Sequence, residues 1–191
     1  MAYTTINKST EHFNTKLYTG DGTTNRGITG VGFQPDLTWI KARSDTTWHH
    51  LFDAVRGANK ALNSNVTNAG GTVATFPSFD SDGFTVNGAN AGNLNISSQT
   101  NASWNWKANG AGSANTDGSI SSTVSANTTS GFSIVKFTPT GSVATIGHGL
   151  GVAPKMIIVK NLGGSSTWSV YHSSLGATKF LRLEDTSAVG T

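Results

Sequence analysis

The chain has 191 residues, of which 36% are hydrophobic and 12% are charged, with 23 glycines and no cysteine. This composition favours a β-rich protein with many turns, and it argues against a helical bundle, a disulfide scaffold and any cysteine-ligated metal site. The net charge is +3 with scattered basic residues, and no apolar run approaches 18 residues, so neither nucleic-acid binding nor membrane insertion is predicted.

The first half of the chain is predicted to form short strands separated by turns. Residues 1–12 form a polar N-terminal arm, and residues 13–19 alternate in polarity before a Thr-Gly-Asp-Gly turn, which is typical of a strand. Pro35 sets an extended entry to a strand at 36–41. Residues 48–52 and 60–63 are predicted to be further strands.

The second half shows the same alternation of strands and turns. The turn at 79–83 is expected to lead into a strand, residues 94–98 and 102–107 follow as extended segments, and residues 108–118 are the most linker-like. A polar stretch then leads to strands expected from Phe132 and at 155–160, 168–172 and 179–183. The pattern predicts an all-β fold, an antiparallel β-sandwich or barrel.

Two blocks of sequence return at a constant offset of 119 residues, which predicts an internal repeat. Residues 13–23 match residues 132–142 without a gap, and residues 52–69 match residues 171–188. We therefore expect a first unit at 13–131 and a second unit at 132–191. The second unit lacks the counterpart of residues 70–131, so the chain is expected either to be a fragment or to pack its incomplete unit on something else.

The tryptophans and histidines are the candidate contact residues. Trp48, Trp104 and Trp106 could stack on a sugar ring, but packing in the core is the favoured interpretation of each. Trp48 in the first unit and Trp168 in the second unit occupy matching positions of the repeat, which favours a core role for both. His49 and His50 are adjacent and would point to opposite faces of a strand, so they cannot chelate one metal ion together, and no metal site is predicted.

The sequence contains few residues and no motif that would suit a catalytic site. There are only two glutamates, and no arrangement of carboxylates suits glycoside hydrolysis. No nucleophile elbow, phosphate loop or dinucleotide fingerprint is present. The sequence therefore predicts a protein that is not an enzyme and has no cofactor.

A resemblance to a known family rests on several segments of the chain. These are GVGFQPDLTWIKARSDTTWHHLFDAVRGANKALNSN, SDGFTVNG, WNWKANG and GHGLGVAPKMIIVKN. They resemble a domain of unknown function in structural proteins of marine tailed bacteriophages, phages of cyanobacteria among them. The resemblance implies a jelly-roll or concanavalin A-like sandwich on a tail fibre or a head, and it supplies no catalytic residue.

The resemblance implies a virion structural protein, which would be a fibre, a decoration protein or an adhesin-type binding module. Such a protein would be made in the host cytoplasm without a signal peptide and would sit in the virion. Its partners would be other virion proteins, further copies of itself (a trimer by analogy with fibre proteins) and a host-surface glycan. The alternatives are a carbohydrate-active enzyme, such as a polysaccharide depolymerase, and a free lectin.

The incomplete second unit also predicts an assembly surface. Its apolar strand residues lack the strands that would cover their counterparts in the first unit, and exposed apolar edges are liabilities in a monomer. We expect Met156, Ile158, Phe180 and Leu181 to be covered by another copy of the chain or by a neighbouring virion protein.

Overall fold

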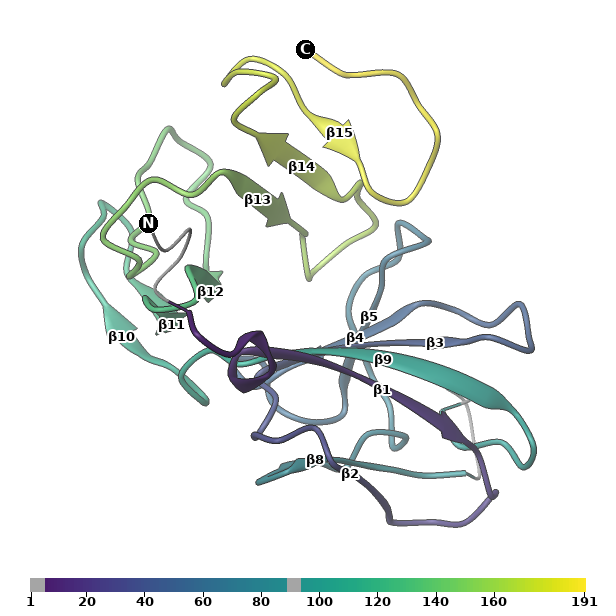
Figure 1. Cartoon of the computed structure of the whole chain (residues 1–191). Helices are drawn as coiled ribbons and strands as arrows, with labels where there is room; N and C mark the ends of the chain where they lie inside the picture. The colour runs from purple at the N-terminus through teal and green to yellow at the C-terminus, as the bar shows by residue number, and fades with distance from the viewer. Residues whose placement is uncertain (1–5, 89–93) are drawn as a thin grey trace.

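The computed structural model describes residues 6–88 and 94–191. Its centre is a six-stranded antiparallel sheet, which forms the middle layer in Figure 1. In spatial order its strands are β1 (Phe13–Thr19), β9 (Thr100–Trp106), β3 (Leu37–Ala42), β4 (His50–Asp53), β5 (Lys60–Asn63) and β6 (Gly71–Thr72). β9 is hydrogen-bonded to β1 on one side and to β3 on the other. Strands from the start and the end of residues 13–106 are therefore neighbours in the sheet.

A three-stranded sheet packs on one face of this central sheet. Its strands are β2 (Arg26–Thr29), β8 (Gly83–Val86) and β7 (Ser78–Asp80). The core between the two sheets is aromatic, because the Phe76 ring stacks on Phe52 at 4.3 Å and on Phe84 at 5.4 Å between ring centroids. The prediction of an all-β, antiparallel sandwich is therefore confirmed.

The inner face of the central sheet carries polar as well as apolar side chains. Thr38, Asn101, Ser103 and Asn105 are fully buried. By register they share a face with Ile40 and Phe52, which belong to the core of the sandwich. The Asn105 amide donates to Ser103 Oγ at 3.0 Å and to the Asn14 carbonyl at 3.1 Å, which offsets part of the cost of burial.

The opposite face of the central sheet is covered by a third sheet, drawn in green and yellow in Figure 1. Its strands are β13 (Met156–Val159), β14 (Ser169–His172) and β15 (Leu181–Arg182). Trp168, which is 4% exposed, packs with Leu51 and Leu62 of the central sheet. The central sheet therefore has buried apolar residues on both of its faces.

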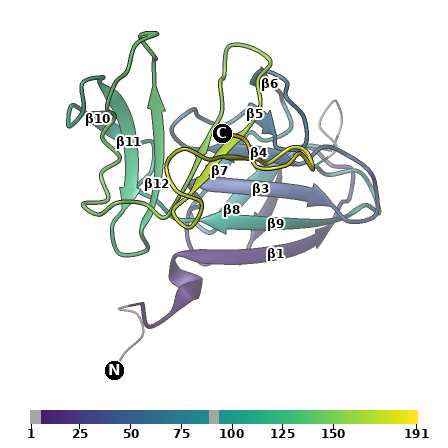
Figure 2. The same ribbon diagram turned by 90° about the horizontal axis from the view of Figure 1, so that it is seen from above.

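A fourth sheet stands beside these layers, and its strands run crosswise to the central strands in Figure 2. Its strands are β10 (Ser113–Asn115), β11 (Ser122–Asn127) and β12 (Phe132–Phe137). The expected linker at 108–118 therefore contains a strand, and the boundary expected between residues 131 and 132 lies in the turn between β11 and β12. A short 3₁₀ turn, η1 (Ser9–Glu11), belongs to the predicted N-terminal arm.

No helix within residues 6–88 and 94–191 is long and apolar enough to cross a membrane.

Candidate functional site

Strand β13 presents an unusual apolar surface, which we call the β13 edge. It consists of Met156, Ile157, Ile158 and Val159, which are 51, 42, 43 and 45% exposed. Within the described part of the chain, β13 is hydrogen-bonded to β14 alone and forms the end of its sheet. Natural sheets usually protect such edges with charges, prolines or bulges, and none of these interrupts β13.

The β13 edge is held in place from its C-terminal end. The Lys160 ammonium donates to the carbonyls of Thr67 and Ser166, each at 3.0 Å, and lies 5.9 Å from the centre of the Trp168 ring. Burial lowers the pKa of Lys160, and the nearby Glu184 carboxylate partly opposes that shift. The lysine therefore ties the end of β13 to the loop that follows β5.

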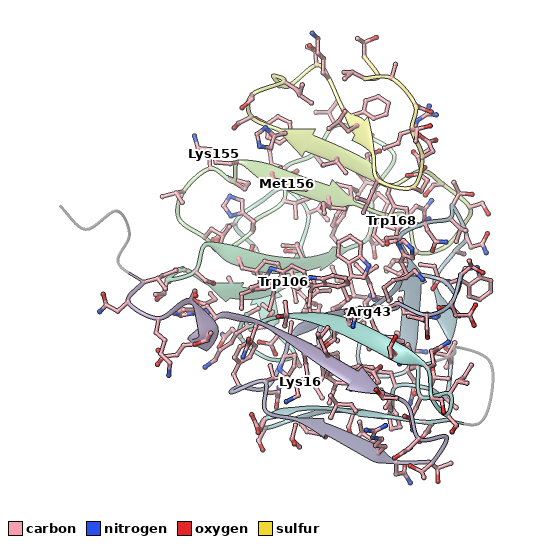
Figure 3. All side chains as sticks on the ribbon, turned by 45° about the vertical axis from the view of Figure 1, so that its right-hand side comes forward. Lys16, Arg43, Trp106, Lys155, Met156 and Trp168 are labelled. Atoms are coloured by element: carbon pink, nitrogen blue, oxygen red, sulfur yellow. The ribbon has the colours of Figure 1, made fainter. Side chains whose placement is uncertain are left out.

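Trp168 anchors the whole sheet beneath this edge, toward the six-stranded sheet (Figure 3). Its indole N–H donates to the carbonyls of Asn63 at 3.2 Å and Val66 at 3.1 Å. Its backbone N–H donates to Glu184 Oε2 at 3.0 Å. These contacts attach the third sheet to the central sheet, while the side chains of β13 remain exposed.

The residues predicted for assembly lie on two strands and one loop position. Met156 and Ile158 are exposed on β13, and Leu181 is 37% exposed on β15. Phe180 is half-buried and is paired through its backbone with Gly190. Four consecutive exposed apolar residues therefore lie on β13, where Ile157 and Val159 are exposed to a similar degree as the two predicted residues.

The first group of predicted contact residues lies at the start of β4. Trp48 is 50% exposed, so its interpretation as a core anchor equivalent to Trp168 is wrong. His50 is buried between the rings of Trp48 and Phe52, at centroid distances of 6.3 and 6.2 Å. His49 is half-buried, and its pKa is lowered by burial and by the neighbouring Lys41 charge. Trp48 is the member of this group with an accessible ring.

Trp104 and Trp106 lie on the face of β9 that looks away from the sandwich core. Trp104 packs edge-on against Trp39 at 6.2 Å. Trp106 contacts Phe13 at 4.9 Å and stacks on Phe132 at 6.2 Å. A hollow of about 290 Å³ beside Trp106 is lined by Ile6, Ser9, His12, Phe13, Trp106, Ser130, Gly131 and Phe132. The strand register places this hollow and the Trp48 group toward opposite ends of the central sheet, so they do not form one site.

Three aspartates of the first unit make contacts that stabilise the fold. Asp36 Oδ2 accepts the backbone N–H of Ala108 at 2.7 Å. Asp53 forms a buried ion pair with Arg56. Asp82 accepts the backbone N–H groups of Gly30 and Gly32, which lower its pKa. Among the described residues, no group of three or more histidine or acidic side chains could hold a metal ion.

Comparison with known proteins adds one finding. A family model described as "Domain of unknown function (DUF7483)" matches residues 8–191. No curated protein and no solved structure matches the chain.

Proposed function

Because the chain belongs to the DUF7483 family, whose description states no activity, we propose a function from the structure and the sequence: a structural and binding module of a bacteriophage virion. The observation that carries this proposal is the β13 edge. Four adjacent apolar residues, exposed on a strand with an open edge, suit a protein that works by contact with other proteins.

Two further observations support the same proposal. Segments of the sequence resemble those of phage structural proteins, and the fold is an all-β sandwich without cysteine. A fibre, a decoration protein and an adhesin would each use such a scaffold. The resemblance, rather than the geometry, points to a particle as the place where the module works.

Mass spectrometry of purified particles of the phage that encodes this chain tests the proposal. We expect peptides of the chain at a copy number comparable to those of other minor structural proteins. Their absence from intact particles, combined with their presence in the surrounding lysate, would overturn the virion role.

A free lectin is the second candidate, because the hollow beside Trp106 offers aromatic rings with His12 at its border. Aromatic rings bind the apolar face of sugars, and the histidine would supply a hydrogen bond. A glycan array with the wild-type chain and with Trp106→Ala separates the two candidates. A defined sugar preference that Trp106→Ala abolishes would favour the lectin.

A polysaccharide depolymerase is the third candidate. It requires two carboxylates facing one another across a cleft. Asp36, Asp53 and Asp82 are instead engaged by backbone N–H groups or by Arg56. Cleavage of host polysaccharide by the pure protein would place this candidate first.

A further inference from the structure

The sheet that contains the β13 edge has the same strand pairing as part of the central sheet. In the central sheet, Leu37 pairs with Asp53 and His50 pairs with Asn63. In the third sheet, Met156 pairs with His172 and Ser169 pairs with Arg182. Each residue of the second set stands 119 positions after its counterpart, and the other pairs of these strands follow the same rule. By register, β13 therefore takes the place of β3.

β3 and β13 differ in their second neighbour. On its side away from β4, β3 is paired with β9, from Leu37 opposite Trp106 to Ala42 opposite Asn101. Among the described residues, β13 has no strand on its side away from β14. The open edge of β13 therefore corresponds to the edge of β3 that β9 fills.

The sequence of β9 shows which side chains a strand carries when it pairs with such an edge. Trp104 and Trp106 alternate with small polar residues along β9 and lie opposite Trp39 and Leu37. The Trp39 and Trp104 rings make an edge-on contact, which adds a specific aromatic interaction to the backbone pairing. A strand with this alternation is apolar on one face and polar on the other.

The same alternation would suit the β13 edge. By register, Met156 and Ile158 share a face with Val170 and Leu181, and this is the face that carries Trp168 toward the central sheet. Aromatic residues opposite Met156 and Ile158 would extend the apolar cluster that Trp168 already forms with Leu51 and Leu62. The added strand would thus cover the edge and continue an existing core.

We propose that the β13 edge binds an extended segment of a partner protein as an added antiparallel strand, in the register that β9 takes on β3. The segment carries aromatic residues at alternating positions, which lie beside Met156 and Ile158, and small polar residues between them. Backbone hydrogen bonds supply affinity in this mode of recognition, and the alternating side chains supply specificity. The proposal names the kind of partner for the structural module proposed above, and it rests on that function only in taking the partner to be a protein.

The chain itself provides a probe for this site. A peptide of residues 99–107, QTNASWNWK, contains the β9 sequence and is compared with a scrambled peptide of the same composition. We expect the first peptide to bind the full chain, as measured by fluorescence anisotropy, and the scrambled peptide to bind at least tenfold more weakly. Hydrogen exchange of the complex should slow at the amides of β13.

Two variants of the chain make the test specific. Ile158→Lys places a charge on the β13 edge and should weaken binding at least tenfold. Val143→Lys changes an equally apolar, fully exposed residue outside the strands and should leave binding unchanged. Thermal unfolding of both variants checks that the fold is retained.

Three outcomes would overturn the proposal. One is the absence of specific peptide binding. Another is protection at β1 and β3 instead of β13, because the peptide would then be exchanging with β9. The third is a dimer that Ile158→Lys dissociates and that fails to bind the peptide, because the edge would then be covered by a second copy. Each outcome leaves the mass spectrometry of particles unaffected, so the two proposals can fail separately.

Discussion

Trp168 is the side chain on which the attachment of the third sheet depends most. It is 4% exposed, and its indole N–H has two carbonyl partners. We expect Trp168→Ala to lower the free energy of unfolding by about 3–5 kcal/mol, because the change leaves a cavity between two sheets and two carbonyls without their donor. Urea unfolding measures this loss.

Trp48 provides a matched control, because it is the same residue type in a 50% exposed position. We expect Trp48→Ala to change the free energy of unfolding by about 0.5 kcal/mol or less. Equal losses for the two variants would contradict the assignment of Trp168 alone to the core.

Tyr18 should make stability depend on alkaline pH. Its hydroxyl donates to the Leu94 carbonyl at 2.8 Å, and burial raises its pKa well above the ordinary value of 10.0, with Arg26 opposing the shift slightly. The folded state keeps the phenol neutral, so stability from this group is complete below pH 10.0 and falls as the pH rises above it, by about 1.4 kcal/mol per pH unit.

Tyr18→Phe removes this dependence along with the hydrogen bond. We expect the variant to lose about 1 kcal/mol at neutral pH and to show a smaller decline between about pH 10 and pH 11 than the wild-type chain. Urea midpoints at these pH values provide the measurement, and identical slopes for the two proteins would show that Tyr18 ionises freely.

At the scale of single elements, the hairpin of β7 and β8 depends on one glycine. Gly83 has φ of 151°, and a Cβ built on it would lie 1.9 Å from the Ile28 carbonyl oxygen of β2. We expect Gly83→Ala to lower the free energy of unfolding by about 1–3 kcal/mol or more, since both the backbone and its neighbour must move. Gly27→Ala, on β2 with open space around its Cβ, is the control and should be close to neutral.

Most strands could be predicted from the sequence, because local alternation and turn residues determine them. Pro35 and the apolar alternation after it place β3, and the turn before Gly83 places β8. β10 could not be predicted in this way, since Ser113–Asn115 has no apolar alternation and is a strand only through its pairing with β11. Its existence depends on tertiary contacts, which local sequence does not encode.

The faces of β9 were harder to predict than its position. An apolar alternation indicates which residues share a face, but it does not show which face meets the sandwich core. The sequence predicts Trp104 and Trp106 in that core, yet the polar Asn101, Ser103 and Asn105 point into it. The opposite face of the central sheet has its own partners, because Trp104 packs against Trp39, which contacts the cluster of Trp168, and Trp106 stacks on Phe132 of the fourth sheet.

At the scale of the whole molecule, the layers should differ in local stability. β9 is hydrogen-bonded along its full length to β1 and along most of its length to β3. Within residues 6–88 and 94–191, β13 is paired with β14 alone, and β15 is two residues long. We expect β9 amides to exchange most slowly and the outward amides of β13 to exchange far faster, because opening an edge breaks fewer contacts. Hydrogen exchange followed by mass spectrometry measures this difference, and uniform rates would contradict the layered description.

The pairing of β1 with β9 also sets the order in which the chain can fold during synthesis. Phe13 pairs with Trp106, so β1 cannot meet β9 until the chain between them, which contains the other strands of the central sheet, has been synthesised. Loops of this length are costly to close, and proteins dominated by such distant pairings fold in milliseconds to seconds rather than microseconds. The hairpin of β13 and β14, by contrast, pairs residues that lie close in the chain. The hairpin of β13 and β14 can therefore form quickly, whereas the central sheet on which it packs is completed slowly.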